Sequence, residues 1–201
     1  MSLRDRLDRE RCLPFVLTAM VIVLDQVSKA IIVSLAPIHG RIWPSPDSFN
    51  QENLLQIIHV RNPAIAFSIG YELPEPVRRV LFVILPILVL VFLVWYYFRS
   101  NEFTRLQRWA TAGILGGGIG NIADRIFRPD GVVDFISVRF FGIFGFERWP
   151  TFNVADMSVV ISCLLLLLTI FIGHGQKPLA KVEIEPEDGQ AASWQEDEQG
   201  T

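Results

Sequence analysis

The 201-residue sequence has only two cysteines and three histidines, and acidic residues outnumber basic ones, giving a formal net charge of −3. Cys12 follows a charged leader and Cys163 lies inside an apolar run, so their placement indicates neither a disulfide nor a metal site. The histidines are scattered, and there is no HExxH or GxSxG motif. The sequence therefore predicts no metal-dependent hydrolase, no serine nucleophile and no cofactor. The absence of a basic excess also argues against nucleic acid as a partner.

Apolar sequence is what the chain has in abundance. Hydrophobic residues make up 51% of it, and the mean hydropathy is +0.37, which is typical of a small integral membrane protein. The first twelve residues, MSLRDRLDRERC, contain no apolar stretch and cannot form a cleavable signal sequence. We therefore expect the apolar segment that follows to remain as a membrane anchor.

Four segments have about the 20 residues that a helix needs to cross a bilayer core. They are residues 13–36, 80–98, 106–127 and 154–172. The second contains Pro86, where we expect a kink. The predicted fold is an all-α polytopic membrane protein with four transmembrane helices. Its domain organisation is a charged leader (1–12), a membrane domain (13–174) and an acidic, disordered tail (175–201).

The positive charges predict the orientation of these helices. Nine lie in the leader, in the link between the second and third segments, or in the tail: Arg4, Arg6, Arg9, Arg11, Arg99, Arg105, Arg108, Lys177 and Lys181. Seven are spread over the two longer opposite loops: Arg41, Arg61, Arg78, Arg79, Arg128, Arg139 and Arg148. The bias per residue predicts that both termini are cytoplasmic.

The loops at residues 37–79 and 128–153 are too long to be simple turns, so we expect them to have structure of their own. Residues 53–60, NLLQIIHV, predict a short strand and are followed by the turn signal Asn62-Pro63. Residues 135–152 are dense in phenylalanine and tryptophan, which suits a segment lying at the headgroup level. Together these loops predict a small extracytoplasmic, β-containing cradle.

Charged and amide side chains interrupt the apolar segments. Asp25 and Lys29 are four residues apart and share one helical face, which predicts a buried ion pair or part of a proton or substrate pathway. Asn121, Asp124 and Arg125 also share one face, at the end of the third segment. An Asp–Arg pair at the helix terminus and a catalytic aspartate are both consistent with this spacing.

Two more aspartates follow. Asp134 lies in VVDF, where apolar neighbours favour the protonated acid. Asp156 lies in FNVAD at the start of the fourth segment, where Asn153 and Asp156 suit the N-cap and first turn of a helix. Two carboxyl groups in one poorly solvated site do not both ionise, so one can act as base while the other donates a proton. Spacing alone does not separate Asp124 from Asp134 in that role.

Five motifs occur in the order VLDQVSKAII, RNPAIAFSIG, GNIADR, VVDF and FNVAD. In this order the sequence resembles lipoprotein signal peptidase (signal peptidase II), a family of bacterial aspartic membrane proteases, over roughly residues 13–172. The resemblance implies an endopeptidase of the bacterial cytoplasmic (inner) membrane with its active site towards the outer face. Its expected partners are membrane lipids and a diacylglyceryl-modified prolipoprotein, cleaved just before the lipid-modified cysteine. We expect a monomer.

The resemblance also implies roles for individual residues. Asp134 and Asp156 correspond to the catalytic dyad. The residues expected to bind substrate or support the dyad are Asp25, Lys29, Asn62, Asn121, Asp124, Arg125 and Asn153. The chain departs from the family at Ala64, where a glycine is usual. Two alternatives from other classes are a proton-coupled transporter that uses Asp25, Lys29 and Asp124 as a relay, and an inactive scaffold that binds lipidated peptides.

Overall fold

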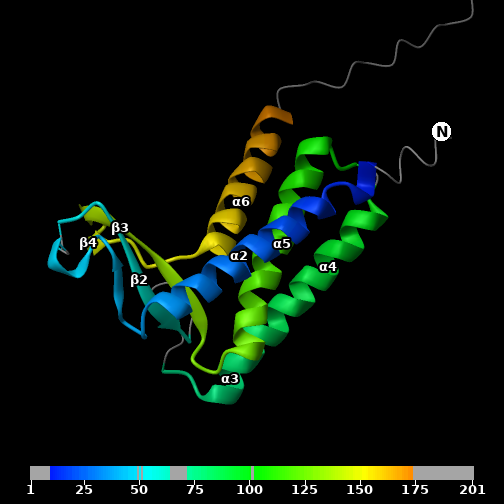
Figure 1. The fold of residues 1–201 in the computed structure, drawn as a ribbon. Helices are drawn as coiled ribbons and strands as arrows, with labels where there is room; N and C mark the ends of the chain where they lie inside the picture. The colour runs from blue at the N-terminus through cyan, green and yellow to red at the C-terminus, as the bar shows by residue number, and fades with distance from the viewer. Residues whose placement is uncertain (1–9, 49, 51, 64–71, 101, 174–201) are drawn as a thin grey trace, which may run out of the picture.

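The computed structural model describes residues 10–48, 50, 52–63, 72–100 and 102–173 (Figure 1). Four long helices form a bundle, and a small antiparallel sheet lies at one end of it. The described chain begins and ends at the opposite end of the bundle (Figure 1). Residues 1–9, Ala64 and the predicted tail lie outside the described residues.

The bundle helices are α2 (Phe15–Leu35), α4 (Leu85–Arg99), α5 (Arg105–Phe127) and α6 (Val154–Gly173). Their bounds agree closely with the four predicted apolar segments. The helix that ends as α4 begins earlier, as α3 (Glu75–Arg79) and a π-helical turn, η3 (Val80–Ile84). This wider turn directly precedes Pro86, where the sequence predicted a kink, and proline has no N–H for a regular helical hydrogen bond.

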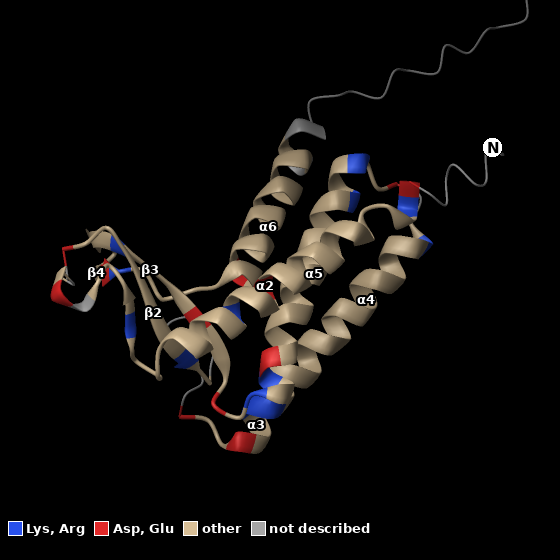
Figure 2. Cartoon of the chain, in the orientation of Figure 1, with Lys and Arg blue, Asp and Glu red and all other residues tan. Residues whose placement is uncertain are grey.

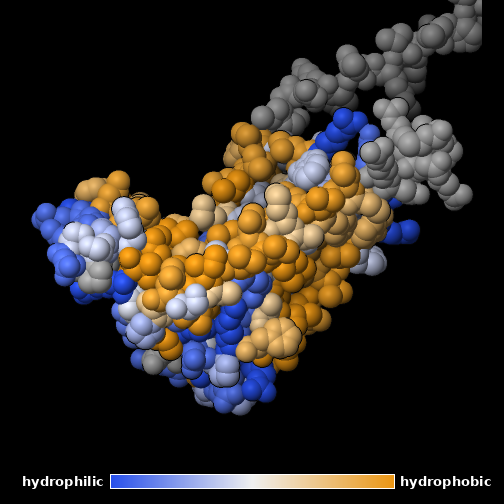
Figure 3. Space-filling model, in the orientation of Figure 1, coloured by the Kyte–Doolittle hydropathy of each residue, from blue (hydrophilic) through white to orange (hydrophobic). Residues whose placement is uncertain are grey.

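The bundle has an apolar exterior. Figure 2 shows most charged residues at the two ends of the helices, and Figure 3 shows a hydrophobic surface over the bundle between them. Among the described residues, two helices are long and apolar enough to cross a membrane: Glu10–Leu35, with a mean hydropathy of 2.0, and Glu75–Arg99, with 2.8. The apolar part of α6, Val154–Thr169, is shorter. Apolar helices thus surround the polar groups described below, the reverse of a water-soluble domain.

The sheet contains β1 (Arg41–Trp43), β2 (Leu55–Asn62), β3 (Val132–Ile143) and β4 (Phe146–Arg148), in that spatial order and antiparallel throughout. The predicted β-containing cradle is therefore present as a small sheet, and β2 lies two residues later than the predicted strand. The aromatic segment 135–152 largely forms β3 and β4. The aromatic composition alone did not reveal that β3 pairs with β2.

Helix α5 packs closely between α2 and α6 because it is rich in glycine. A Cβ at Gly116 would lie 2.8 Å from Val21 Cβ on α2, whereas a Cβ at Gly117 would lie 2.3 Å from the backbone oxygen of Ala155 on α6. Hydroxyl groups add contacts at the same interfaces: Thr18 Oγ1 donates to Ala112 O at 2.8 Å, and Ser158 Oγ donates to Gly113 O at 2.9 Å. Small residues at such spacing permit close helix approach in a membrane protein.

We predict that Gly117→Ala destabilises the protein by about 1–3 kcal/mol, because the new methyl group meets backbone that cannot rotate away. Gly118→Ala is the matched control. Its Cβ would meet only the end of the Leu90 side chain, at 2.9 Å, which can change rotamer. The measurement is thermal unfolding of the full-length variants in one detergent, and equal melting temperatures for the two variants would contradict the packing described here.

Candidate functional site

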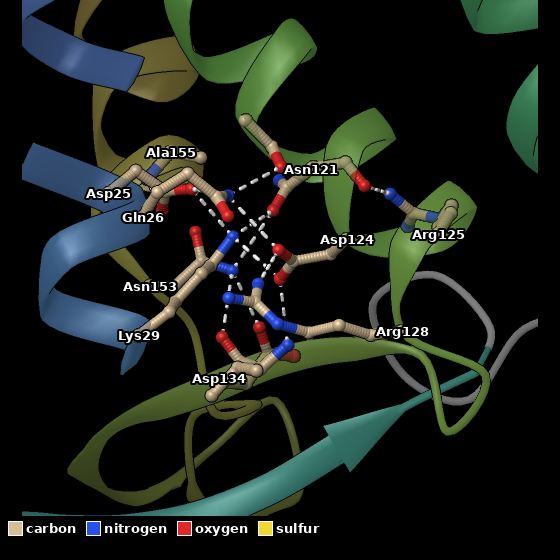
Figure 4. Close-up of polar contacts among 12 residues, drawn as sticks. Asp25, Gln26, Lys29, Asn121, Asp124, Arg125, Arg128, Asp134, Asn153 and Ala155 are labelled. Carbon is tan, nitrogen blue, oxygen red and sulfur yellow. Dashed lines mark hydrogen bonds and ion pairs between the residues drawn. The ribbon is translucent and has the colours of Figure 1, made fainter. Parts of the chain in front are cut away.

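The polar side chains of the bundle gather where α2, the end of α5, the start of α6 and β3 meet (Figure 4). At the centre is the fully buried ammonium of Lys29. Its Nζ lies 2.8 Å from Asp25 Oδ2 and 3.0 Å from Asp124 Oδ2, and it donates to Asn121 Oδ1 at 3.0 Å. The predicted Asp25–Lys29 ion pair is confirmed. Three contacts match the three protons of an ammonium group.

The Asp124 carboxylate is also fully buried and links four segments of the chain. Its Oδ1 accepts from the Arg128 guanidinium and, at 3.0 Å, from Gln26 Nε2. Its Oδ2, which contacts Lys29, also accepts from the backbone N–H of Val133 at 3.1 Å. This last bond holds the start of β3 against α5, directly beside Asp134.

Arg128 is a residue of the site that the sequence reasoning missed. The spacing was consistent with an Asp124–Arg125 pair, but the described contacts of the Asp124 carboxylate with cations are those of Lys29 and Arg128. Arg125 donates instead through NH1 to the backbone oxygen of Asn121, at 3.1 Å. The four-residue spacing of Asp124 and Arg128 is the signal that could have identified the pair. Figure 4 shows Arg125 at the side of the cluster, with Arg128 reaching into it.

Asp25 connects α2 to the first turn of α6. Its Oδ1 accepts from the backbone N–H of Ala155 at 3.0 Å, and its Oδ2 also accepts from Gln26 Nε2 at 3.0 Å. The first N–H groups of a helix have no partner within it, so a carboxylate there both satisfies a donor and interacts favourably with the helix dipole. The contact fixes the position of α6 relative to α2.

Asn153 and Asp156 form a reciprocal cap at the start of α6. Asn153 Oδ1 accepts from the backbone N–H of Asp156 at 3.0 Å, and Asp156 Oδ2 accepts from the backbone N–H of Asn153 at 3.1 Å. The predicted capping interaction is thus present, in the arrangement of a capping box. The other oxygen, Asp156 Oδ1, accepts from Asn121 Nδ2 at 2.7 Å. Capping therefore leaves one carboxylate oxygen of Asp156 directed towards the cluster.

Asp134 lies on β3 opposite Val60 of β2, and its side chain is 3% exposed. Its Oδ2 accepts from Asn62 Nδ2 at 3.0 Å and its Oδ1 from Asn153 Nδ2 at 2.7 Å. Burial, followed by the negative charge of Asp156, raises the pKa of the Asp134 carboxyl to about 7, against the two hydrogen bonds, which lower it. This carboxyl group therefore retains its proton to a higher pH than an ordinary aspartate does.

Two asparagine amides connect the two carboxyl groups. Asn153 Nδ2 donates both to Asp134 Oδ1 and, at 3.1 Å, to Asn121 Oδ1. Because Asn121 Oδ1 also accepts from Lys29, the amide nitrogen of Asn121 must face Asp156. The charge of Lys29 thus fixes the orientation of the amide that holds Asp156.

All nine site residues predicted from the sequence belong to one connected set of contacts: Asp25, Lys29, Asn62, Asn121, Asp124, Arg125, Asp134, Asn153 and Asp156. Gln26 and Arg128 extend it. A carboxyl group with a raised pKa, beside a carboxylate at a helix N-terminus, is an arrangement suited to general acid–base chemistry.

The fold and this buried site define a small membrane enzyme. Two solved structures, each described as a bacterial membrane enzyme, are similar to the chain with TM-scores of 0.69 and 0.64. Both are 26% identical to it; they cover 85% and 79% of this chain, and 94% and 92% of their own.

Sequence comparison defines the family more closely. The family described as Signal peptidase (SPase) II matches residues 17–172. The lipoprotein signal peptidase of Treponema pallidum is 44% identical over 83% of this chain and 87% of its own length. That of Treponema denticola is 50% identical over 75% of this chain and 83% of its own. The chain belongs to the signal peptidase II family, and the resemblance found in its five motifs is confirmed.

We predict that Lys29→Met strongly destabilises the protein, by about 3–5 kcal/mol, because it leaves Asp25 and Asp124 buried with one cation fewer. Arg79→Met is the matched control, since the Arg79–Glu75 pair is 70% and 71% exposed. Loss of such an exposed pair costs about 0–1 kcal/mol. The measurement is thermal unfolding of both variants and the wild type in the same detergent. A Lys29→Met protein as stable as the wild type would contradict the central role of the Lys29 ammonium.

Proposed function

We propose that the protein is an aspartic endopeptidase that removes the signal peptide from diacylglyceryl-modified prolipoproteins, cleaving before the lipid-modified cysteine. Asp134 and Asp156 form the catalytic dyad in this proposal. The observation that carries it is the pair of carboxyl groups joined by the Asn121 and Asn153 amides, one of them with a pKa raised to about 7. The names of the two Treponema relatives, lipoprotein signal peptidase, support the substrate class.

The two carboxyl groups have different tasks in the proposed mechanism. Asp156 acts as the base, because one of its oxygens accepts the capping N–H bond of α6 while the other, held by Asn121, is directed towards the cluster. Asp134 is the acid, because its carboxyl keeps a proton near neutral pH. Asp156 takes a proton from water as the water oxygen attacks the scissile carbonyl carbon, and Asp134 donates its proton to the carbonyl oxygen. When the C–N bond of this tetrahedral intermediate breaks, the carbonyl oxygen returns a proton to Asp134 and Asp156 protonates the leaving nitrogen.

The supporting residues hold the dyad and the substrate in this proposal. Asn62 and Asn153 position Asp134, and Asn121 positions Asp156. Asp25, Lys29 and Asp124 hold the three helices and the start of β3 together around them. Arg125, at the side of the cluster, is a candidate to bind the substrate backbone.

We also propose that all four bundle helices cross the bacterial inner membrane, with both termini cytoplasmic and the sheet at the outer face. The 23 residues of α5 and the 20 of α6 give helices of about 35 and 30 Å, which match a hydrocarbon core of about 30 Å. The low hydropathy of α5 is tolerable because α2 and α4 pack against it and shield part of its surface from lipid. The chain is proposed to act as a monomer.

The tip of the sheet is proposed to lie at the headgroup level, where it covers substrate that enters laterally between the helices. Phe141 and Phe144 at this tip are 62% and 85% exposed, and Phe140 packs against Trp149 with ring centroids 4.9 Å apart. Aromatic residues favour the membrane–water interface. Their exposure on one hairpin supports the predicted interfacial position.

We predict that Asp134→Asn and Asp156→Asn each lower cleavage of a diacylglyceryl-modified prolipoprotein by about 10²–10⁴-fold, the range of general acid–base catalysis. Asp130→Asn is the control, because Asp130 is an exposed carboxylate in the turn before β3. The assay uses purified full-length variants whose folding is verified by thermal unfolding. A folded Asp134→Asn or Asp156→Asn protein with full activity would rule out the dyad.

The raised pKa of Asp134 predicts the pH dependence of cleavage. A general acid must be protonated, so the rate falls as the pH rises through about 7. The hydrogen bond from Asn62 stabilises the ionised form, so Asn62→Ala raises the pKa of Asp134 further and moves this alkaline limb to higher pH. The measurement is kcat/KM against pH for the wild type, Asn62→Ala and the exposed control Asn50→Ala. An unmoved limb in Asn62→Ala, or activity that rises through pH 7, would contradict Asp134 as the acid.

A further inference from the structure

A pocket lies beside the polar residues around Lys29 and the proposed dyad, here called the catalytic cluster, at the sheet end of the bundle. It has a volume of about 350 Å³, and arginines from two helices and the segment after α5 line it: Arg78, Arg79, Arg125 and Arg128. Its other walls include the apolar side chains of Phe82, Val83 and Ile126. Figure 2 shows blue residues around α3 and the nearby end of α5 at this place.

The four arginines of the pocket differ in how they are paired. Arg128 binds Asp124, and Arg125 donates to the Asn121 backbone, so both face the catalytic cluster. Glu75 is the only carboxylate that lines the pocket among the described residues, and its partner Arg79 lies 2.8 Å away in an exposed ion pair. Arg78 is half-buried, and no described residue pairs with its guanidinium. One cation is thus uncompensated and a second is held only by a solvent-exposed contact.

The pocket lies at the boundary between apolar and charged surface. Val80 and Ile84, which follow the two arginines on the same helix, are 50% and 47% exposed, and Phe127 at the end of α5 is 80% exposed. Figure 3 shows this hydrophilic surface around α3 bordering the hydrophobic surface of the helices. Guanidinium groups directly above exposed apolar helix surface are placed where a bilayer changes from acyl chain to headgroup.

We propose that this pocket binds the phosphate group of an anionic phospholipid, with the acyl chains lying along the exposed apolar residues of η3 and the end of α5. A guanidinium group presents paired N–H donors that match two phosphate oxygens. Arg78 supplies the permanent contact, and Arg79 joins it when it leaves Glu75. The lipid would occupy the helix boundary next to the catalytic cluster, and this binding does not depend on how the dyad is assigned.

The test is lipid retention by the purified full-length protein, measured by native mass spectrometry with phosphatidylglycerol, phosphatidylcholine or inorganic phosphate added. We expect phosphatidylglycerol to be retained preferentially. Arg78→Gln should weaken that retention about fivefold, since one basic residue near a membrane surface contributes about 1 kcal/mol. Glu75→Gln should strengthen it, because Arg79 is released. Arg99→Gln, an exposed arginine at the other end of the same helix, is the control and should have no effect.

Opposite effects of Arg78→Gln and Glu75→Gln separate a binding site from a merely structural role. Equal retention of phosphatidylglycerol by Arg78→Gln and the wild type would overturn the proposal. So would a wild-type protein that retains phosphatidylcholine as well as it retains phosphatidylglycerol. If inorganic phosphate binds as tightly as the lipid and displaces it, the pocket is a site for free phosphate and the lipid assignment is wrong. Weaker binding in Glu75→Gln would also contradict the assigned role of Arg79.

Discussion

The buried ammonium of Lys29 is the interaction on which the rest of the structure depends. A charge removed from water is tolerated only with close partners, and Lys29 has two carboxylates and an amide oxygen within 3.0 Å. Each partner extends to another element: Asp25 to the start of α6, Asp124 to the start of β3, and Asn121 to Asp156. One cation therefore fixes three helices and a strand relative to one another. The glycines of α5 make this possible, because a Cβ at Gly120 would lie 2.7 Å from Asp25 Oδ2.

The same contacts that stabilise the fold also differentiate the two carboxyl groups. Asp156 is the third residue of a helix and completes its cap, so one of its carboxylate oxygens accepts a backbone N–H at the start of that helix. Asp134 lies on a strand, receives two amide hydrogen bonds and lacks a helix terminus or a direct cation contact among the described residues. Burial beside the charge of Asp156 then raises its pKa. In the proposed mechanism, these two chemically identical side chains serve as acid and base because they occupy different positions in the fold.

Local sequence patterns predicted the helices and much of the site, but not the strand pairing. Apolar length gave the four helices, and the four-residue spacing gave Asp25–Lys29. Arg128 was missed because it lies just past the predicted helix end, although it has the same spacing from Asp124. The contact of Asn62 with Asp134 joins residues 72 positions apart through the register of β2 and β3, for which the sequence holds no local signal. Gly131 has a φ of 99°, which permits the turn from α5 into β3. The requirement for glycine at this position is likewise evident only from the structure.

The most direct test of this account is the protonation state of Asp134 itself, measured by difference infrared spectroscopy of the full-length wild type against Asp134→Asn across pH 4–9. We predict a protonated-carboxyl band in the wild type that disappears with a midpoint near pH 7 and is absent from Asp134→Asn. A wild-type spectrum in which no carboxyl band remains above about pH 5, close to the range of ordinary carboxyl groups, would contradict it. In that case neither the burial of Asp134 nor the charge of Asp156 retains the proton, and the acid–base assignment fails.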